Sequence, residues 1–342
     1  MKGLSAVILL VLALSVTLAL TVYVIFGVIR DNESRTPYNA IMATQSVVSA
    51  MPAATQSNTM ASFQPPDEAS LPDDGFGNMV RLGKEIFTHT DTAVPQFVGS
   101  HLQCESCHLD AGRRPDAAPM WAAYGLYPAY RKKNHHVNTF SERLQLGFRY
   151  SMNGKAPPSG GPVLVALETY SYWLAKGAPT GVKLKGQGLL KLAQPALPPD
   201  FTRGGVVYAQ HCAACHQANG AGGLLGGTMK IPALWGDDSY NWGAGMQQVS
   251  NAAGFIKANM PLDQGYSLSD QDAWDVAQFI DSHERPQDPR YTGSVAETRR
   301  QYHDDADSMY GQMVEGHVLG SNSPPAGKVI DGGNRSMLHS LQ

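Results

Sequence analysis

The four cysteines of this chain fall into two copies of one short pattern, and this feature constrains the fold most. Among 342 residues they occur only as CESCH at 104–108 and as CAACH at 212–216. Cys-x-x-Cys-His is the attachment pattern of c-type haem, in which two thiols bind the porphyrin and the histidine binds the iron. The pattern therefore predicts two covalently bound haem c groups, held by Cys104, Cys107 and His108 and by Cys212, Cys215 and His216.

Two other chemistries use closely spaced cysteines, and both explain this sequence less well. A redox-active Cys-x-x-Cys pair usually follows a strand at the start of a helix, and no such junction is visible around either copy. A four-cysteine zinc site would leave the two adjacent histidines without a role. Haem attachment accounts for all six residues.

The segments around the two motifs repeat in the same order, which predicts the fold class. Helical spacing of apolar residues occurs at 76–88, 139–151 and 163–175, and again at 206–210, 252–259 and 269–284. Ser269 and Asp272 form a capping pair for the last helix, which we expect Pro286 to stop. We predict an all-α protein with two tandem class I cytochrome c-like domains, produced by duplication of one helical unit.

The first residues predict a membrane anchor. From Leu4 to Ile29 there are 26 residues without a charge. A helix of that length spans roughly 39 Å, enough to cross a hydrocarbon core of about 30 Å. The apolar run is longer than that of a signal peptide and lacks a clear cleavage site, so we expect an uncleaved single-pass helix. Haem c is attached outside the bacterial cytoplasmic membrane, so we expect an inner-membrane protein with both haem domains in the periplasm.

Composition then separates the globular domains from the connecting segments. Residues 31–74 are rich in Ala, Ser, Thr, Pro and Gln without a period, which predicts a flexible linker. The net charge of −3 argues against a nucleic-acid binder. The predicted organisation is an anchor over 1–30, the linker over 31–74, domains over 75–192 and 193–287, and a tail over 288–342 that wraps or dangles, with one short helix at 294–303.

Each iron is expected to take a second axial ligand, for which methionine and histidine are the usual residues. Met260, which lies 44 residues after His216, is the predicted ligand in the second domain, with Met246 as its rival. Met152 lies 44 residues after His108 and is the predicted ligand in the first domain. Met120 and the pair His135 and His136 stay open as alternatives there. Core packing is the commoner role of methionine.

Basic residues accumulate in the first domain between 101 and 160. They are Arg113, Arg114, Arg131, Lys132, Lys133, Arg143, Arg149 and Lys155, opposed only by Glu105, Asp110, Asp116 and Glu142. Such an excess can draw an anion such as a sulfur oxyanion to the haem edge. It can equally be a solvated surface that docks an acidic partner protein.

Longer stretches around both motifs resemble the dihaem thiosulfate dehydrogenase family. The resemblance is carried by CESCHLDAG, ERLQLGFRYSMNGKAPP, PALWGDDSYNWGAGM and FIKANMP, and it extends over roughly 76–286. It implies oxidation of two thiosulfates to tetrathionate at the first haem. Electrons then leave through a second haem with histidine and methionine as its ligands, which supports Met260.

One position departs from that family. Its first haem has a cysteine thiolate as distal ligand, and the corresponding position here is Gly147. All four cysteines belong to the two haem motifs, so either Met152 replaces the thiolate or the iron keeps an open face.

The sequence alone therefore leaves three functions. The first is electron transfer in a respiratory or sulfur-oxidation chain, to a soluble cytochrome, an oxidase or a quinol-linked complex. The second is a thiosulfate dehydrogenase that forms tetrathionate. The third is a cytochrome subunit of a larger respiratory complex.

Overall fold

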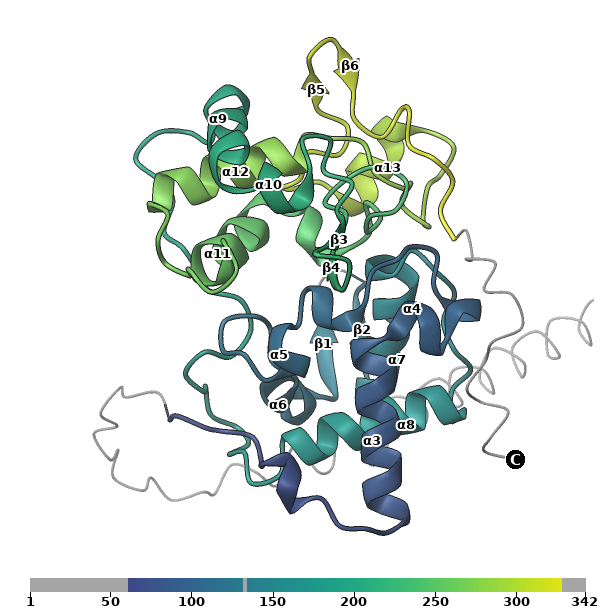
Figure 1. Cartoon of the computed structure of the whole chain (residues 1–342). Coiled ribbons are helices and arrows are strands. Elements are labelled where there is room, and N and C mark those ends of the chain that lie inside the picture. Colours follow the sequence, from purple (N-terminus) through teal and green to yellow (C-terminus); the bar gives the residue numbers. More distant parts are fainter. Residues whose placement is uncertain (1–60, 132–133, 328–342) are drawn as a thin grey trace, which may run out of the picture. The chain divides into compact units, whose positions relative to one another are not determined.

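A computed structural model describes residues 61–131 and 134–327, and these are mostly helical (Figure 1). The α-helices of the first half are α3 (Gly75–Thr88), α4 (Thr90–Ala93), α5 (Leu109–Gly112), α6 (Met120–Ala123), α7 (Phe140–Leu146) and α8 (Pro162–Leu174). A π-helical turn, η6 (Gly147–Ser151), directly continues α7. The 3-10 helices of this half are η2 (Glu68–Ser70), η3 (Pro95–Phe97), η4 (Cys104–Ser106) and η5 (Tyr124–Leu126).

The second half has its own set of helices. They are α9 (Phe201–His211), α10 (Ala213–His216), α11 (Val249–Asn259), α12 (Asp270–Asp281) and α13 (Val295–Tyr302), with a 3-10 helix η7 (Gly245–Gln247) before α11. All six helices predicted from apolar spacing are present in the described residues, together with the short one predicted in the tail.

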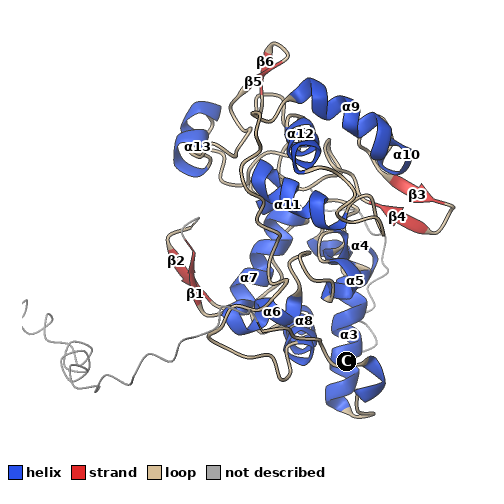
Figure 2. Ribbon diagram, turned by 90° about the vertical axis from the view of Figure 1, so that its left-hand side faces the viewer, coloured by secondary structure: helices blue, strands red, loops and turns tan. Residues whose placement is uncertain are grey.

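The described strands form only three two-stranded antiparallel hairpins, which Figure 2 shows in red. They pair β1 (Ala129–Arg131) with β2 (His136–Asn138), β3 (Gly223–Leu225) with β4 (Met229–Ile231), and β5 (Met313–Val314) with β6 (His317–Val318). The all-α prediction missed these hairpins because strands of two or three residues leave no detectable alternation.

Side-chain caps explain where the longer helices begin. Asp74 accepts the backbone N–H of Gly77 at the start of α3. Thr139 and Glu142 form a reciprocal capping box at the start of α7. Ser269 caps α12 by accepting the N–H of Asp272, as the sequence predicts. The end of α12 was predicted wrongly, because the helix stops at Asp281, several residues before Pro286.

The same helix crossing occurs in both halves. Helix α3 packs against α8, and α9 packs against α12. A Cβ atom on Gly83 would lie 2.1 Å from the Ala166 carbonyl oxygen, and one on Gly204 would lie 2.0 Å from the Asp275 carbonyl oxygen. Glycine is therefore required where each pair crosses, and this shared device supports the predicted duplication.

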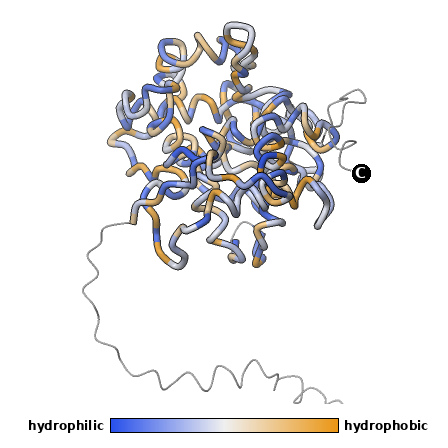
Figure 3. Tube along the Cα trace, turned by 60° about the horizontal axis from the view of Figure 1, so that its bottom comes forward, coloured by the Kyte–Doolittle hydropathy of each residue, from blue (hydrophilic) through white to orange (hydrophobic). Residues whose placement is uncertain are grey.

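Each half buries its own apolar core. The first core includes Val80, Phe87, Trp121 and Leu164, and the second includes Tyr208, Trp274 and Ile280. Along the described chain, hydrophobic and hydrophilic positions alternate within the helices, as Figure 3 shows. This pattern is typical of amphipathic helices that pack around a core.

The described part of the predicted linker is structured. In the segment 61–74, Phe63 packs on Trp121 with ring centroids 5.6 Å apart, and the Pro66 carbonyl accepts a hydrogen bond from Arg113. The remainder of the predicted linker lies outside the described residues. Between the two halves, the connecting segment ends at Asp200, because its side chain accepts the Arg203 N–H and starts α9 at Phe201.

The segment 288–327 belongs to the second half rather than dangling from it. Tyr310 and Leu319 are completely buried in the second core. Within the described part of the chain, no helix is long and apolar enough to cross a membrane. The anchor predicted over 1–30 lies outside that part.

Candidate functional site

The first Cys-x-x-Cys-His motif follows α4 and is fixed by local hydrogen bonds. The Thr90 hydroxyl oxygen accepts the backbone N–H of Cys104 at 3.0 Å, and it lies 3.3 Å from the Cys104 sulfur. Gln103 and Ser106 exchange capping contacts around the 3-10 turn η4. His108 Nδ1 lies 2.7 Å from the Ala118 carbonyl oxygen, so that Nδ1 carries the proton and Nε2 is left for a metal.

The second motif has the same geometry. Cys212 lies between α9 and the short helix α10, and Cys215 and His216 lie on α10. His216 Nδ1 lies 3.0 Å from the Pro232 carbonyl oxygen, which again leaves Nε2 available. Burial lowers the pKa of both His108 and His216, so both rings are neutral, which is the form that binds iron.

The cysteine thiols lie in environments that do not suit a redox-active pair. All four cysteines are free in the structure. Burial raises the pKa of Cys104 to about 11, of Cys107 to about 12 and of Cys212 to about 11. A redox-active dithiol needs a thiol pKa lowered below its usual value, so these environments oppose that alternative.

The residues of both motifs fit haem c. Each motif offers two thiols and one neutral imidazole beside its own apolar core. The four-cysteine zinc alternative fails, because among the described residues no three His, Cys, Asp or Glu side chains gather to hold a metal ion. When bound, haem c supplies a one-electron redox centre that the side chains of this chain do not offer.

The alternative ligands in the first half lie in different environments. Met152 is buried in the first core and follows the π-helical turn η6. Met120 is also buried, and it packs so close to Gly112 that a Cβ there would lie 2.7 Å from its Cγ. His135 and His136 are exposed on the β1–β2 hairpin, where they contact Tyr130 and Glu142. Met152 stays the predicted ligand.

The two candidates in the second half are both partly buried. Met260 caps the C-terminal end of α11 and packs on the second core. Met246 lies in η7 and packs against both cores. Met260 packs on the second core alone, so it stays the predicted ligand of the second iron.

Gly147 faces open space. A Cβ atom built on Gly147 would have no neighbouring atom within 4 Å. The residue is the first of the π-helical turn, a local conformation that often marks functional sites. Arg143 lies one helical turn earlier, on the same face, and its charge contributes, after burial, to the lowered pKa of His108. The cationic side chain of Arg143 is therefore close enough to the first haem motif to act on it electrostatically.

The structure divides the predicted basic cluster. Arg113 bonds to the Pro66 carbonyl and lies over Trp173, and Arg114 pairs with Asp263. Arg131 lies over the ring of Tyr127, and Lys132 and Lys133 fall outside the described residues. The exposed side chains of Arg143, Arg149 and Lys155 form no hydrogen bond or ion pair with any described residue, which leaves them free for an anion.

A buried polar cluster was missed by sequence reasoning. The Tyr240 hydroxyl donates to Asp281 at 3.1 Å, and Arg285 Nη2 donates to the same carboxylate oxygen at 3.2 Å. Tyr240 lies in the first core and is close enough for electrostatic contact with Cys107, while Asp281 is on α12. Burial raises the pKa of Asp281 to about 7, against the opposing charge of Arg285. No local pattern connects residues so far apart in sequence.

Comparisons with known proteins agree with the resemblance seen in the sequence. The cytochrome c family model matches residues 201–284, which implies covalently bound haem c. The chain is 54% identical to a thiosulfate dehydrogenase of Thiomonas intermedia (strain K12) over 267 residues, covering 78% of this chain and 85% of that protein. It is 49% identical to a thiosulfate dehydrogenase of Stutzerimonas stutzeri (strain A1501) over 260 residues, covering 75% and 85%.

A solved structure gives the same result. The chain resembles thiosulfate dehydrogenase (TsdBA) from Marichromatium purpuratum in its "as isolated" form, with a TM-score of 0.73 and 50% sequence identity. The match covers 76% of this chain and 57% of that longer chain.

Proposed function

This chain belongs to the thiosulfate dehydrogenase family, and we propose that it joins two thiosulfate ions into tetrathionate at a haem on Cys104, Cys107 and His108. Cys212, Cys215 and His216 would hold a second haem, which would supply the one-electron centre from which the electrons leave. The observation that carries the proposal is the identity to thiosulfate dehydrogenases over 85% of their length, together with two equivalent haem motifs.

The reaction balances without protons. One sulfur–sulfur bond forms between the outer sulfurs of two thiosulfate dianions, and two electrons leave. Two one-electron centres in one chain can take both electrons from a single product-forming event. The residues of the chain need only hold two anions together beside the first haem and keep the iron accessible to electron transfer.

The free cationic side chains of the first half support this role. Two dianions repel each other, so a cationic group that faces the site lowers the free energy of bringing them together. Arg143 is placed for this, because its charge reaches the His108 ring and it lies one helical turn before Gly147, where a Cβ atom would have no neighbour within 4 Å. We assign Arg143 to substrate binding.

Replacing Arg143 with glutamine should raise the KM for thiosulfate about tenfold, since a charge-assisted hydrogen bond contributes about 1.5–3 kcal/mol. The haem spectra should not change. Arg149→Gln is the matched control, because Arg149 is also exposed and lies six residues later, which places it on another side of the helical segment. Equal effects of the two substitutions on KM would mean that only the net charge matters.

Steady-state turnover tests the enzyme against the simple electron carrier. Purified protein given thiosulfate and ferricyanide should form tetrathionate, with two ferricyanides reduced for each tetrathionate. A protein that carries electrons only between partners would keep intact haems and show no turnover. Simple electron transfer would then be the better description of both haems.

The buried polar cluster of Tyr240, Asp281 and Arg285 predicts that the reduction potential of the nearby haem depends on pH. Asp281 is protonated below its folded pKa of about 7 and ionised above it. A reduced haem carries one positive charge less, so reduction favours the protonated carboxyl group. The reduction potential of this haem should therefore fall as the pH rises from 6 to 8. The fall should be smaller than about 59 mV per pH unit, which is the limit for a step that couples one electron to one proton.

The substitution Asp281→Asn should remove this pH dependence in a redox titration. Asp270→Asn is the matched control, because Asp270 is exposed on the same helix. If the slope survives in Asp281→Asn, a different group is responsible for it.

The predicted location is part of the same proposal. The uncharged run from Leu4 to Ile29 and the attachment of haem c outside the cytoplasmic membrane both support an anchored, periplasmic protein. Gentle detergent extraction of membranes should recover the chain. Redox proteins recovered with it in fixed stoichiometry would make it a subunit of a larger complex, and isolation always alone would count against that.

A further inference from the structure

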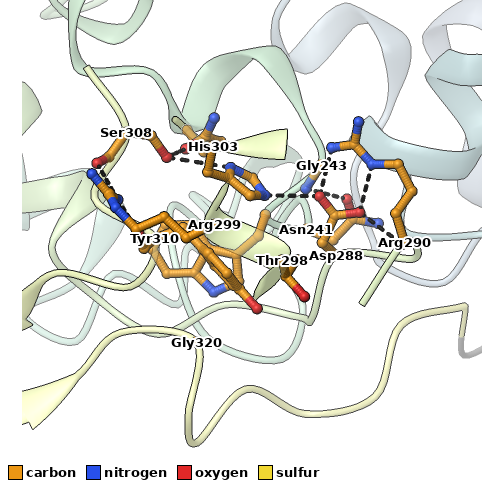
Figure 4. A network of polar contacts seen from close by, with 12 residues as sticks. Asn241, Gly243, Asp288, Arg290, Thr298, Arg299, His303, Ser308, Tyr310 and Gly320 are labelled. Atoms are coloured by element: carbon orange, nitrogen blue, oxygen red, sulfur yellow. Dashed lines mark hydrogen bonds and ion pairs between the residues drawn. The ribbon is translucent and has the colours of Figure 1, made fainter. Parts of the chain in front are cut away.

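The segment that follows α12 contains a buried charged network, which Figure 4 shows. Asp288, His303 and Ser308 are all buried. Asp288 Oδ2 lies 2.9 Å from His303 Nε2, and His303 Nδ1 lies 3.3 Å from Ser308 Oγ. Ser308 in turn donates to Gln247 at 2.8 Å. The network ties the C-terminal segment to the second half at the turn η7.

The carboxylate of Asp288 also binds the guanidinium of Arg290. Arg290 Nε and Nη2 donate to the two carboxylate oxygens at 2.9 and 2.6 Å. Burial alone would raise the pKa of Asp288, but the hydrogen bonds from His303 and Arg290 hold it well below its usual value. The carboxylate is therefore ionised at every physiological pH, and the guanidinium is held in one orientation.

The guanidinium of Arg290 reaches the first half. It lies over the ring of Tyr302 at 4.2 Å and over the ring of Tyr150 at 5.2 Å. Tyr150 belongs to the π-helical turn η6, which begins at Gly147. Cation–π contacts of this kind are strongest when the cation is shielded from water, and Arg290 is largely buried.

A second set of contacts reaches the same turn. The Asn241 side chain donates to the Arg149 carbonyl oxygen at 2.9 Å and to Asn153 Oδ1 at 3.0 Å. The backbone N–H of Asn241 donates to the Tyr150 carbonyl oxygen. A Cβ atom on Gly243 would lie 2.4 Å from Tyr150 Cδ1, so only glycine allows the approach. Residues of the second half thus hold η6 from several sides.

We propose that Arg290 is a positioning residue for the first haem site, through which the C-terminal segment 288–327 holds the π-helical turn η6 in place. The inference rests on the proposed function only in placing that haem beside Gly147. The physical reason is that a π-helical turn has weaker internal hydrogen bonding than an α-helix and needs external contacts to persist. Arg290 supplies a rigid one, because Asp288 fixes its orientation.

The test replaces Arg290 with methionine, which keeps the length of the stem and removes the charge. The two haem potentials and the absorption spectrum of each haem are then measured on the full chain. The first haem should change its spectrum and shift its potential, while the second haem should keep both. In turnover with thiosulfate, kcat should fall more than KM rises. Arg290→Lys should restore part of the shift, because it restores the charge but not the paired hydrogen bonds.

Arg300→Met is the matched control, since Arg300 is exposed on α13 and its ion-pair partner among the described residues is Glu297 on the same helix. It should leave both haems unchanged. If Arg290→Met does not fold, Tyr302→Leu removes one of the two rings on the guanidinium and keeps the bonds of Asp288, and the same first-haem shift is expected. Unchanged haems with only a lower melting temperature, or equal shifts of both haems, would overturn the proposal. The spectra and potentials need no thiosulfate, so absence of turnover would contradict the proposed function and leave this inference standing.

Discussion

A variant in which both Cys104 and Cys107 are serine should be isolated with a single haem and should not oxidise thiosulfate. The reason is that neither thioether can form, so the half-buried His108 has no porphyrin to hold. Intact-protein mass spectrometry and the absorbance of the denatured haem measure the loss. We expect the activity to fall to the background of the assay.

The reciprocal variant, with serine at Cys212 and Cys215, is the matched control. It should also hold one haem, but that haem should still be reduced by thiosulfate, while steady-state transfer to an acceptor becomes slow. Two haems in either variant, or full turnover in the first, would show that the roles of the motifs are assigned wrongly.

Replacing Met260 with alanine should have the second largest effect. The second iron would lose a thioether ligand, and its low-spin spectrum should give way to a high-spin one. Thioether ligation raises the potential, so the potential of this haem should fall, on the order of 0.1 V or more given that axial ligands set haem potentials over about 0.8 V. Redox titration followed by absorbance in the visible region measures both changes.

Met152→Ala provides the parallel test at the first haem. If Met152 binds the iron, the spectrum of the first haem changes while that of the second does not. If Met152 serves only the core, the spectrum stays the same and the free energy of unfolding falls by about 2–5 kcal/mol. The iron would then have an open face beside Gly147, and the ligand assignment would be wrong.

The local features of this protein could be predicted from its sequence. Both haem motifs are contiguous, and the caps at Thr139 and Ser269 lie within three residues of their partners. Apolar spacing then located the helices that carry or cover the motifs. These signals are local, and local signals survive in a single sequence.

The contacts between distant segments could not be predicted in this way. The tail shows no periodicity, so the sequence left open whether it wraps or dangles; in the described residues 288–327 it wraps, with Tyr310 and Leu319 buried in the second core. The pairing of Asp281 with Tyr240, like that of Arg290 with Tyr150, joins residues that no spacing rule connects. Burial determines their chemistry, and burial is a property of the folded chain.

The most direct test of the account mixes the oxidised full chain with thiosulfate, without oxygen and without any other electron acceptor. The account predicts that the haems become reduced and that one tetrathionate appears for every two haems reduced. Haems that stay oxidised in thiosulfate, although dithionite reduces both, would contradict it.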